Sequence, residues 1–260
     1  MLFEEKKPIL FSCPAEYDSI VIYSIHDLHF GNECFNEKRW KKLKEEILSQ
    51  PNHFCVFVGD LFENAIPNSK GDCFSQTHTP QQQKEWITQQ LIDLKPRTIA
   101  VVPGNHEYNR TTKACGLYPL YDCCLLAGIG HLYRNAYAVV DVGVGDGGHG
   151  KGKQIRYVGY LTHKAKDNKQ HSTAHTLEGF DFMFFGHDHD PKDKARAKLV
   201  YDNKNKSVSF KDVEVINNGA FLDFGGYGAR DGYPPPATKM YKLILDGKTK
   251  DIKSLGFHLR

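Results

Sequence analysis

Histidine, aspartate and asparagine side chains recur along the 260-residue chain directly after short apolar runs. They are Asp27, His29, Asp60, Asn105, His106, His163, His187 and His189. A single histidine is more often a packed or surface residue than a ligand, but a set this large at successive strand ends is hard to explain by packing. Mixed shells of carboxylate and imidazole suit divalent cations such as Mn²⁺, Fe²⁺ or Zn²⁺. The pattern therefore predicts a metal site.

A dinuclear site would give these residue types a definite chemistry. A carboxylate that bridges two cations holds them roughly 3.5–4 Å apart, so that both can bind oxygens of one phosphate. The pair also lowers the pKa of a water between them, and the resulting hydroxide can attack phosphorus in line with the leaving group. The set therefore points to hydrolysis of a phosphate ester.

Alternating strands and helices in the first half of the chain must position these residues. β-Branched and aromatic runs predict strands at residues 20–25, 54–58 and 98–102, and apolar residues at helical spacing predict helices at 36–50 and 81–94. This order indicates parallel βαβ units. Ligand sites in such sheets lie at the carboxyl ends of the strands, so we expect the polar loops to converge on one edge.

The second half is expected to be richer in β-structure. Strand-like runs occupy residues 136–141, 154–161, 182–185, 213–217 and 240–245, and they predict a second, β-rich layer. One short helix is expected near residues 172–178. The glycine-rich stretch at 143–152 is expected to connect a hairpin and not to bind phosphate, because a strand and not a helix follows it. With no repeat or composition shift, we expect one domain over residues 1–260.

Five motifs carry the polar set in order. They are Asp27-x-His29, Gly59-Asp60, Gly104-Asn105-His106-Glu107, His163 and Gly186-His187-x-His189. Together they resemble the motif series of the calcineurin-like metallophosphoesterases, and the likeness runs over residues 20–220. The resemblance implies an α/β fold in which two sheets and flanking helices form a four-layer αββα sandwich.

The resemblance also implies which residues bind metal. The implied ligands are Asp27, His29 and His189 for a first ion, Asn105, His163 and His187 for a second, and Asp60 as the bridge between them. The implied cofactors are two divalent metal ions, with Mn²⁺ first and Fe, Zn or Ni as alternatives.

His106 is implied to be catalytic and not a ligand. In the implied mechanism a metal-bridging hydroxide attacks the phosphate in line, and His106 protonates the leaving group. To be an imidazolium near neutral pH, His106 needs an orienting acid. Many family members carry an aspartate three residues after the bridging aspartate, and Glu63 occupies that position here. We therefore expect Glu63 to be the second catalytic residue.

Residues beside the motifs have two possible roles each. Glu107 is expected to hold the loop of His106. Arg110 and Lys164 either meet a phosphate or face solvent. His26 either lies on the opposite side of the strand end or contacts a metal ligand.

The motif around the bridging aspartate favours one substrate class. Protein phosphatases of this superfamily carry arginine directly after the orienting acid, and Asn64 stands there instead. The segment from Gly59 to Glu63 more closely resembles the nuclease and phosphodiesterase branch, which includes the Mre11 and SbcD repair nucleases. We therefore expect a phosphodiesterase or nuclease. The alternatives are a phosphomonoesterase or nucleotide phosphatase on the same scaffold, and a non-catalytic binding subunit.

Several segments outside the motifs bear on the substrate, which is expected to be a phosphate ester and possibly a nucleic acid or nucleotide. The long Gly-, Pro- and aromatic-rich loop at 221–236 is expected to border the substrate groove. Basic groups at 192–198 and 239–260 either track a nucleic-acid backbone or lie on solvated hairpins. Aromatic residues that either stack on a base or pack in the core are Phe30, Phe62, Tyr108, Phe224 and Tyr227.

Composition limits the setting. Lys and Arg number 34 against 31 Asp and Glu, so a net charge of +3 gives no strong field toward nucleic acid or membrane. No apolar run approaches the 18 or so residues of a membrane helix, and no secretion signal is visible. Seven scattered cysteines without a CxxC pair indicate a reducing compartment. We expect a cytoplasmic protein with no membrane partner, and the sequence leaves its oligomeric state open.

Overall fold

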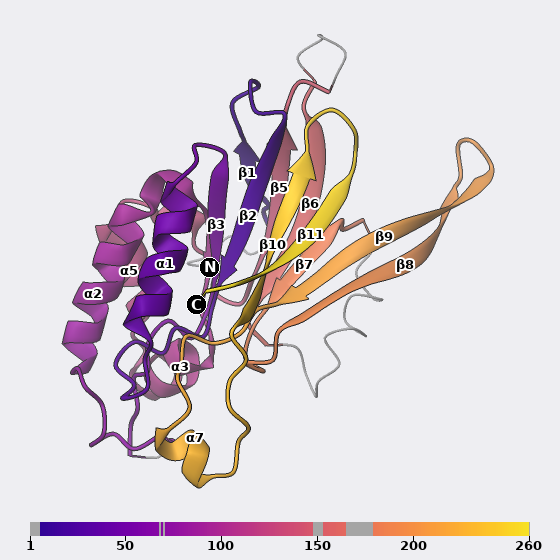
Figure 1. The fold of residues 1–260 in the computed structure, drawn as a ribbon. Helices are drawn as coiled ribbons and strands as arrows, with labels where there is room; N and C mark the ends of the chain where they lie inside the picture. Colours follow the sequence, from indigo (N-terminus) through magenta and orange to yellow (C-terminus); the bar gives the residue numbers. More distant parts are fainter. Residues whose placement is uncertain (1–5, 68, 70, 148–152, 165–178, 260) are drawn as a thin grey trace.

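Two β-sheets stacked face to face form the centre of the computed structural model (Figure 1). The structure describes residues 6–67, 69, 71–147, 153–164 and 179–259. The α/β fold with two stacked sheets, expected from the resemblance, is confirmed. The short helix expected near 172–178 lies outside the described residues.

The first sheet has five strands. In spatial order they are β11 (Ile252–His258), β10 (Lys239–Asp246), β2 (Ser19–Ile25), β3 (His53–Val58) and β4 (Thr98–Val102). β2, β3 and β4 run parallel, which confirms the βαβ units, and β10 is antiparallel to both of its neighbours. The carboxyl ends of three strands therefore meet at one edge.

Helices α1 (Glu37–Leu48), α2 (Pro80–Asp93) and α5 (Pro119–Leu126) cover the outer face of this sheet (Figure 1). The Asn36 side chain caps α1 by accepting the backbone N–H of Arg39. A Thr79–Gln82 capping box begins α2. The described residues also form short helical segments: η1 (Lys95–Arg97), α3 (Asn105–Glu107), η2 (Tyr108–Thr112), α4 (Lys113–Cys115), η3 (Gly130–Leu132) and α7 (Gly226–Arg230). In the part of the chain that is described, no helix is long and apolar enough to cross a membrane.

The second sheet has six strands. In spatial order they are β1 (Ile9–Ser12), β5 (Tyr137–Val144), β6 (Ile155–Thr162), β7 (Phe182–Phe185), β9 (Ser207–Asn217) and β8 (Lys192–Asp202). β5 and β6 pair as an antiparallel hairpin, as expected for the glycine-rich connection, of which residues 148–152 lie outside the description. β7 lies parallel between β6 and β9.

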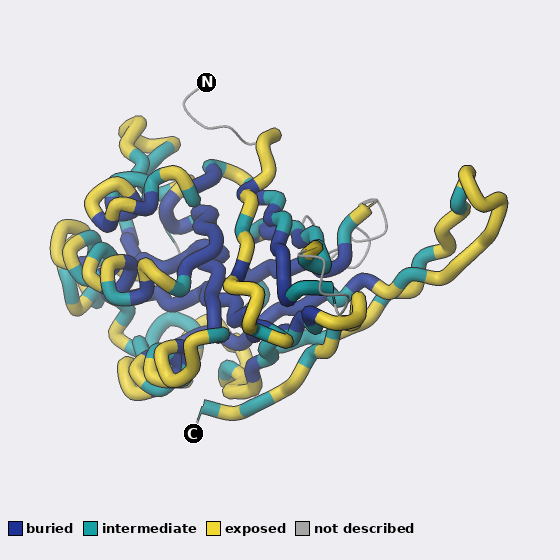
Figure 2. The backbone as a smooth tube through the Cα atoms, turned by 90° about the horizontal axis from the view of Figure 1, so that it is seen from above, coloured by how far each residue is buried: buried dark blue, intermediate teal, exposed yellow. Residues whose placement is uncertain are grey.

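The expected division into two halves of the chain is wrong, because each sheet takes strands from both ends. β10 was expected in the β-rich layer but pairs with β2 in the first sheet, and β1 pairs with β5 in the second. β8 and β11 are further strands, each the antiparallel partner in a hairpin. Both basic groups therefore lie on hairpins, and the hairpin of β8 and β9 projects past the sandwich (Figures 1 and 2).

Large apolar side chains fill the space between the sheets. Ile20 and Val56 from the first sheet pack with Val140, Tyr157 and Phe182 from the second, and all five are at most 1% exposed. Figure 2 shows this buried layer at the centre of the molecule and the exposed surface around it. The rigid core fixes the strand ends from which the polar loops emerge.

We expect Gly159→Ala to destabilise the fold. Gly159 in β6 pairs with Phe182 in β7, and a Cβ at Gly159 would collide with the Phe182 ring. Overpacking of this kind costs about 1–3 kcal/mol. Urea unfolding measures the loss, with Gly228→Ala as control because an added Cβ there meets nothing within 4 Å. Equal unfolding free energies for the two variants would contradict the expectation.

Candidate metal centre

The loops after five strands bring the expected polar set together at one edge of the two sheets. Asp27 and His29 follow β2, Asp60 follows β3, Asn105 and His106 follow β4, His163 follows β6, and His187 and His189 follow β7. Backbone hydrogen bonds tie these loops to one another. Asp27 N–H donates to Gly59 O at 3.0 Å, and His29 N–H donates to Asp60 O at 3.1 Å. These backbone hydrogen bonds fix the relative positions of the loops that carry the polar side chains.

Backbone strain is concentrated in this set. Five of its residues have a left-handed backbone with φ between 49° and 79°: Asp27, His29, Asp60, His187 and His189. Such a conformation costs a non-glycine residue roughly 1–2 kcal/mol. Strained residues cluster where the surrounding structure holds side chains for a function. The strain thus marks the same residues that the motifs single out.

Two glycines allow the β3 and β4 loops to touch. Gly59 has φ +80°, and a Cβ there would collide with the backbone of Gly104. A Cβ on Gly104 would in turn collide with Asp60. This close approach lets the backbone N–H of His106 donate to Asp60 Oδ1 at 2.7 Å. The glycines in the two motifs are therefore needed for contact between loops.

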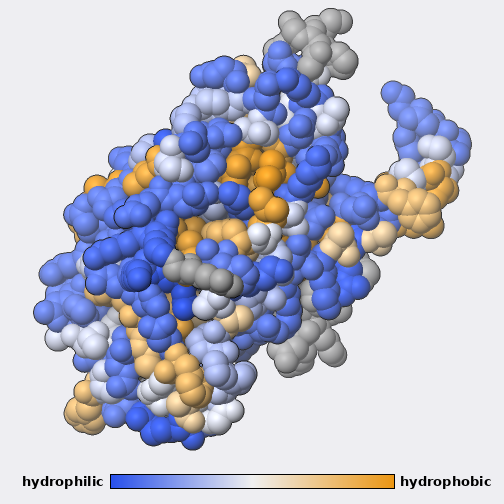
Figure 3. Space-filling model, viewed as in Figure 1, coloured by the Kyte–Doolittle hydropathy of each residue, from blue (hydrophilic) through white to orange (hydrophobic). Residues whose placement is uncertain are grey.

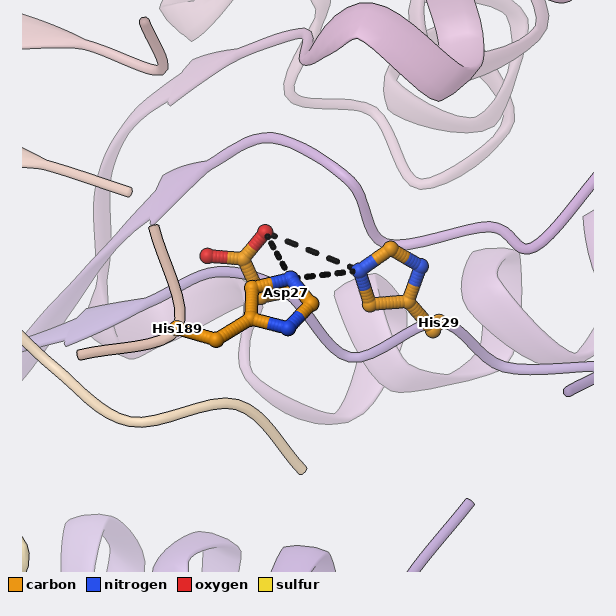
Figure 4. A group of neighbouring side chains, drawn as sticks. All are labelled: Asp27, His29 and His189. Carbon is orange, nitrogen blue, oxygen red and sulfur yellow. Dashed lines mark hydrogen bonds and ion pairs between the residues drawn. The ribbon is translucent and has the colours of Figure 1, made fainter. Parts of the chain in front are cut away.

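Asp27, His29 and His189 form the first cluster, with ligand-type atoms all within 4.8 Å of one another (Figure 4). Asp27 Oδ1 lies 3.6 Å from His29 Nε2 and 3.3 Å from His189 Nε2. The two imidazole Nε2 atoms are 3.1 Å apart. This is the group that the resemblance assigns to a first ion.

Asp60, His163 and His187 form the second cluster, and Asp60 also groups with His29 and His106. His163 Nε2 lies 3.1 Å from Asp60 Oδ2 and 3.9 Å from Asp27 Oδ1. Asp60 is thus the carboxylate between the two groups. Asn105, Asp60 and His187 line one cavity. All seven expected ligands are therefore brought together, while their binding of metal stays a prediction.

The imidazoles are oriented by contacts at their outer nitrogens. His163 Nδ1 donates to Val58 O at 2.7 Å, and His106 Nδ1 donates to Glu63 O at 2.8 Å. His29 Nδ1 lies 3.2 Å from a Glu63 carboxylate oxygen. In each case Nε2 is left to face the cluster. This arrangement fixes ring orientation and tautomer, as in protein metal sites.

His26 supports the first cluster from behind. The backbone N–H of Asn218 donates to His26 Nε2 at 3.1 Å, so the ring proton is on Nδ1 and donates to Asp27 Oδ2 at 2.7 Å. The alternative of a ligand contact is therefore the one that the structure shows. No role was predicted for Asn218, although the segment Asn217-Asn218-Gly219-Ala220 resembles the strand-end segment that often follows the last motif of the family, and it lies at the end of β9 at this edge.

Glu107 holds two loops at once. Its carboxylate accepts the backbone N–H groups of Asp60, Leu61, Phe62 and Gly104, at 2.7–3.2 Å. The expected loop-holding role is therefore what the contacts show. The carboxylate spans the same pair of loops that Gly59 and Gly104 bring together.

Glu63 contacts His106 in a different way from the one expected. The backbone carbonyl of Glu63, and not its carboxylate, accepts the His106 Nδ1 proton, and the nearest carboxylate oxygen is 3.9 Å from that nitrogen. The carboxylate instead contacts His29 at 3.2 Å and Arg110 at 3.2 Å. Burial opposes ionisation, but the charges of His29, His106 and Arg110 lower the pKa of Glu63 to about 2.

Buried carboxylates set the charge of the surrounding imidazoles. Burial opposes the charged form, yet hydrogen bonds to Asp27 and Glu63 raise the pKa of His29 to about 10. In the same way the charge of Asp60 raises the pKa of His163 to about 9 against its burial. The histidines around them in turn hold the pKa of Asp27 and of Asp60 below the usual range despite burial. In the metal-free site at pH 7, His29 and His163 are therefore charged and face ionised carboxylates.

His106 and His187 behave differently, and burial lowers the pKa of both. His106 shows the larger shift. Burial and repulsion by His29 and Arg110 lower its pKa to about 4, against the attraction of Asp60. In the metal-free protein His106 is thus neutral at pH 7 and presents an Nε2 lone pair. Donating a proton would require it first to take one up.

The donor set fits divalent cations. Within the described residues, Asp27 Oδ1, Asn105 Oδ1 and His163 Nε2 are buried atoms without a hydrogen bond of normal geometry, and the first and third have only imidazole or carboxylate atoms as ion-pair neighbours. Buried polar atoms are normally satisfied, so three in one cluster of carboxylate, amide and imidazole point to a missing partner. The carboxylate, amide and imidazole groups match the shells of Mn²⁺, Fe²⁺ and Zn²⁺ and do not distinguish among them.

A cavity of about 1250 Å³ opens onto the clusters. Arg110, Lys113 and Lys164 lie on its wall, as do residues of the loop at 221–236, including Phe224, Tyr227 and Tyr233. The loop therefore lies beside the site, as expected. Phe30 and Phe62 are core residues, whereas Tyr108 is exposed. Lys192 pairs with Asp188 and Asp190 beside the site, and the hairpin carrying the rest of that basic group extends away from α7 (Figure 1).

The model of one known family matches the chain. It is described as calcineurin-like phosphoesterase and covers residues 21–191, so the chain belongs to the calcineurin-like phosphoesterase family. The match does not distinguish the nuclease branch from the others. No curated protein matches the chain.

Several solved structures are similar over most of the chain. A conserved protein of Streptococcus pneumoniae, described as a predicted phosphoesterase, has 12% identity, a TM-score of 0.38 and coverage of 92% of this chain and 98% of that one. Vps29 of Entamoeba histolytica, complexed with zinc, has 11% identity, a TM-score of 0.43 and coverage of 93% and 100%. A metallophosphoesterase of Sphaerobacter thermophilus has 12% identity, a TM-score of 0.42 and coverage of 93% and 90%.

Metal binding is expected to release protons and to strengthen as pH rises. The raised pKa values mean that His29 and His163 carry protons at pH 7 without metal, whereas only a neutral imidazole binds a cation. We therefore expect Mn²⁺ affinity to increase from pH 6 to pH 8. Calorimetric titration in buffers of different ionisation enthalpy should show release of about one proton or more per protein. Binding heat that is independent of buffer would contradict this.

Glu63→Gln is expected to weaken metal binding more than it changes the state of His106. The substitution removes the charge beside His29 and Arg110 but keeps the backbone carbonyl that accepts from His106. Loss of such an outer contact typically costs about 10–100-fold in metal affinity. Titration with Mn²⁺ measures it, with Glu37→Gln on the exposed face of α1 as control. If the variant kept its affinity for Mn²⁺ but lost turnover, the Glu63 carboxylate would act on His106, as the sequence predicts.

Proposed function

We propose that this protein is a metal-dependent phosphodiesterase that acts on nucleotide-type esters, including nucleic acid. One observation carries the proposal: a single cavity is lined by members of both ligand clusters, by His106, and by cationic and aromatic side chains. The cluster members on its wall are His29, His189, Asp60 and His187. Membership in the family supports phosphoester hydrolysis, and the cavity supports the choice of substrate. In this proposal a single domain over residues 1–260 performs the reaction.

The clusters supply the places for two cations, Mn²⁺ by preference. Their proposed ligands are Asp27, His29, Asp60, Asn105, His163, His187 and His189. When bound, the cations supply Lewis-acid activation of the phosphate and of water. The chain itself orients three of the imidazoles, those of His29, His106 and His163, through carbonyl and carboxylate partners at Nδ1.

His106 is proposed to handle the proton of the leaving oxygen. Its Nδ1 proton is fixed on Glu63 O, so only Nε2 can exchange a proton with the cavity. An anionic phosphate near this ring favours the imidazolium and raises its pKa from the low value of the metal-free site. His106 then donates from Nε2 as the ester bond breaks.

The two cavity walls are proposed to recognise the remainder of the ester. Arg110, Lys113 and Lys164 offer positive charge to a phosphate oxygen or to a second phosphate. Phe224, Tyr227 and Tyr233 offer aromatic surface on which a base can stack. Phe224 and Tyr233 are about half exposed, so their rings are accessible. The loop at 221–236 therefore shapes specificity in this proposal.

A cytoplasmic setting belongs to the same proposal. All seven cysteines are free, and four of them are buried, which suits a reducing compartment. Burial raises the pKa of the Cys55 thiol to about 12 and that of Cys123 to about 11, so these two are poor nucleophiles at neutral pH.

The activity test compares three substrates in the presence of Mn²⁺: bis-p-nitrophenyl phosphate, p-nitrophenyl phosphate and single-stranded DNA. We expect the diester and the DNA to be hydrolysed faster than the monoester. Turnover of the monoester alone would replace the proposal by a phosphomonoesterase. Metal binding without any turnover would favour the non-catalytic alternative.

His106→Asn is expected to lower kcat by about 10²–10⁴-fold while Mn²⁺ still binds, because the variant loses the proton donor and keeps the proposed ligands. The loss should be larger for a phenyl diester than for a p-nitrophenyl diester, since the poorer leaving group needs the proton more. His131→Asn on the exposed η3 segment is the control. Equal losses for both leaving groups would assign His106 a positioning role instead.

A further inference from the structure

The hairpin of β8 and β9, here called the arm, carries an apolar face that nothing in the described part of the chain covers. Each strand has eleven residues, and the arm projects past the sandwich (Figures 1 and 2). Leu199, Tyr201, Val208 and Phe210 are 68%, 59%, 59% and 79% exposed. Figure 3 shows apolar surface on the arm next to its hydrophilic end.

The ladder register places these four side chains on one face. Leu199 pairs with Phe210 and Tyr201 pairs with Val208, and directly opposed residues of an antiparallel pair point to the same side of a sheet. The next pairs inward on that side are Ala197 with Asp212 and Ala195 with Glu214, followed by Ile216, which packs between the two sheets. The apolar face is thus the core face of the second sheet continued beyond the sandwich.

A two-stranded hairpin is marginally stable alone in water, and an exposed apolar cluster of this kind marks an interaction site. We propose that the arm pairs with the arm of a second copy of this chain, apolar face against apolar face, in an antiparallel two-fold arrangement. The proposal is independent of the activity proposed above.

Charge complementarity favours this occupant. On the apolar face, Asp212 is the next charged residue from the patch toward the sandwich, and the turn at 203–206 is the next segment toward the tip of the arm. A two-fold axis through the middle of the patch places Asp212 of one copy where the turn of the other copy lies. It brings Asp212 of each copy opposite the turn of the other, where Lys204 and Lys206 are exposed. Each end of the interface would then join opposite charges.

The polar end of the arm argues against a lipid surface. Asp202, Asn203, Lys204, Asn205 and Lys206 form a hydrogen-bonded turn at the extreme end, so insertion end-on would bury polar and charged groups. The reverse face carries Lys198 opposite Lys211. A partner that lies flat against the apolar face covers the patch and leaves the reverse face, with Lys198 and Lys211, outside the interface.

The size of the patch sets the expected strength. Two arms of this width cover on the order of 1000 Å² in total, which is the lower limit for a specific interface. We therefore expect a dimer with a dissociation constant in the micromolar range, and reversible exchange between monomer and dimer.

Sedimentation equilibrium over a series of protein concentrations tests the pairing. Phe210→Glu is expected to weaken the dimer by about 10-fold or more, because it places charge at the centre of the patch. Ser209→Glu, on the neighbouring residue but the reverse face, is the matched control and should leave the dimer intact. Phe210→Ala keeps the strand uncharged and should weaken the dimer in the same direction but less. Circular dichroism and a cooperative urea unfolding transition confirm that each variant is folded.

A charge exchange tests the two-fold arrangement. Lys204→Glu should weaken the dimer, and adding Asp212→Lys to the same chain should restore it. A wild-type protein that stays monomeric at every concentration overturns the proposal, as does a dimer that Phe210→Glu leaves unchanged. Failure of the exchange to restore the dimer overturns the antiparallel arrangement. Binding of the wild type, but not of Phe210→Glu, to vesicles of acidic phospholipid would overturn the proposal in favour of a lipid surface.

Discussion

The structure depends on two carboxylates, Asp27 and Asp60, that are held side by side at a sheet edge and shielded from water. Buried negative charges cost several kcal/mol each unless positive partners stand close to them. His29, on the same loop as Asp27, and His163, on the β6 loop, provide those partners, and their protonation in the metal-free chain follows from the field of the carboxylates. The left-handed backbones of the strand-end loops are tolerated because this attraction and the loop-to-loop hydrogen bonds hold them. A divalent cation would supply the same positive charge without protons.

A second set of residues keeps the carboxylates where they are. The Glu107 carboxylate accepts four backbone N–H groups from the β3 and β4 loops. His26 accepts the backbone N–H of Asn218 after β9 and donates to Asp27, so it connects the two segments. Glu63 connects His29, His106 and Arg110 through different atoms. Backbone contacts therefore hold the site in place, and the loop at 221–236 adds aromatic side chains to the lining of the same cavity.

Sequence reasoning reached the site more easily than the sheet order, for physical reasons. Parallel strands end on one edge, so polar residues after β2, β3 and β4 had to meet once those strands were identified. The pairing of β10 with β2 depends on contacts between distant parts of the chain, which local patterns do not report. β8 was not predicted as a strand, because its sequence lacks the apolar period of a buried strand. Small or polar residues alternate there with Lys192, Lys194, Arg196 and Lys198. The contacts of Glu63 could not be predicted, because the sequence does not show whether a carboxylate one methylene longer than that of aspartate reaches His106 or His29.

The exchange of strands between the two ends of the chain has a consequence for how the molecule forms. β2 is bordered on one side by β3 and on the other by β10, and Lys242 in β10 pairs with Tyr23 in β2. While a ribosome is still making the last strands, β2 presents an open edge that can pair with any extended chain. The side of β2 in the sheet that carries Asp27 and Asp60 is covered only after β10, at Lys239–Asp246, has been synthesised. Such long-range pairing predicts slow folding, with the free side of β2 among the last parts of the sheet to be covered.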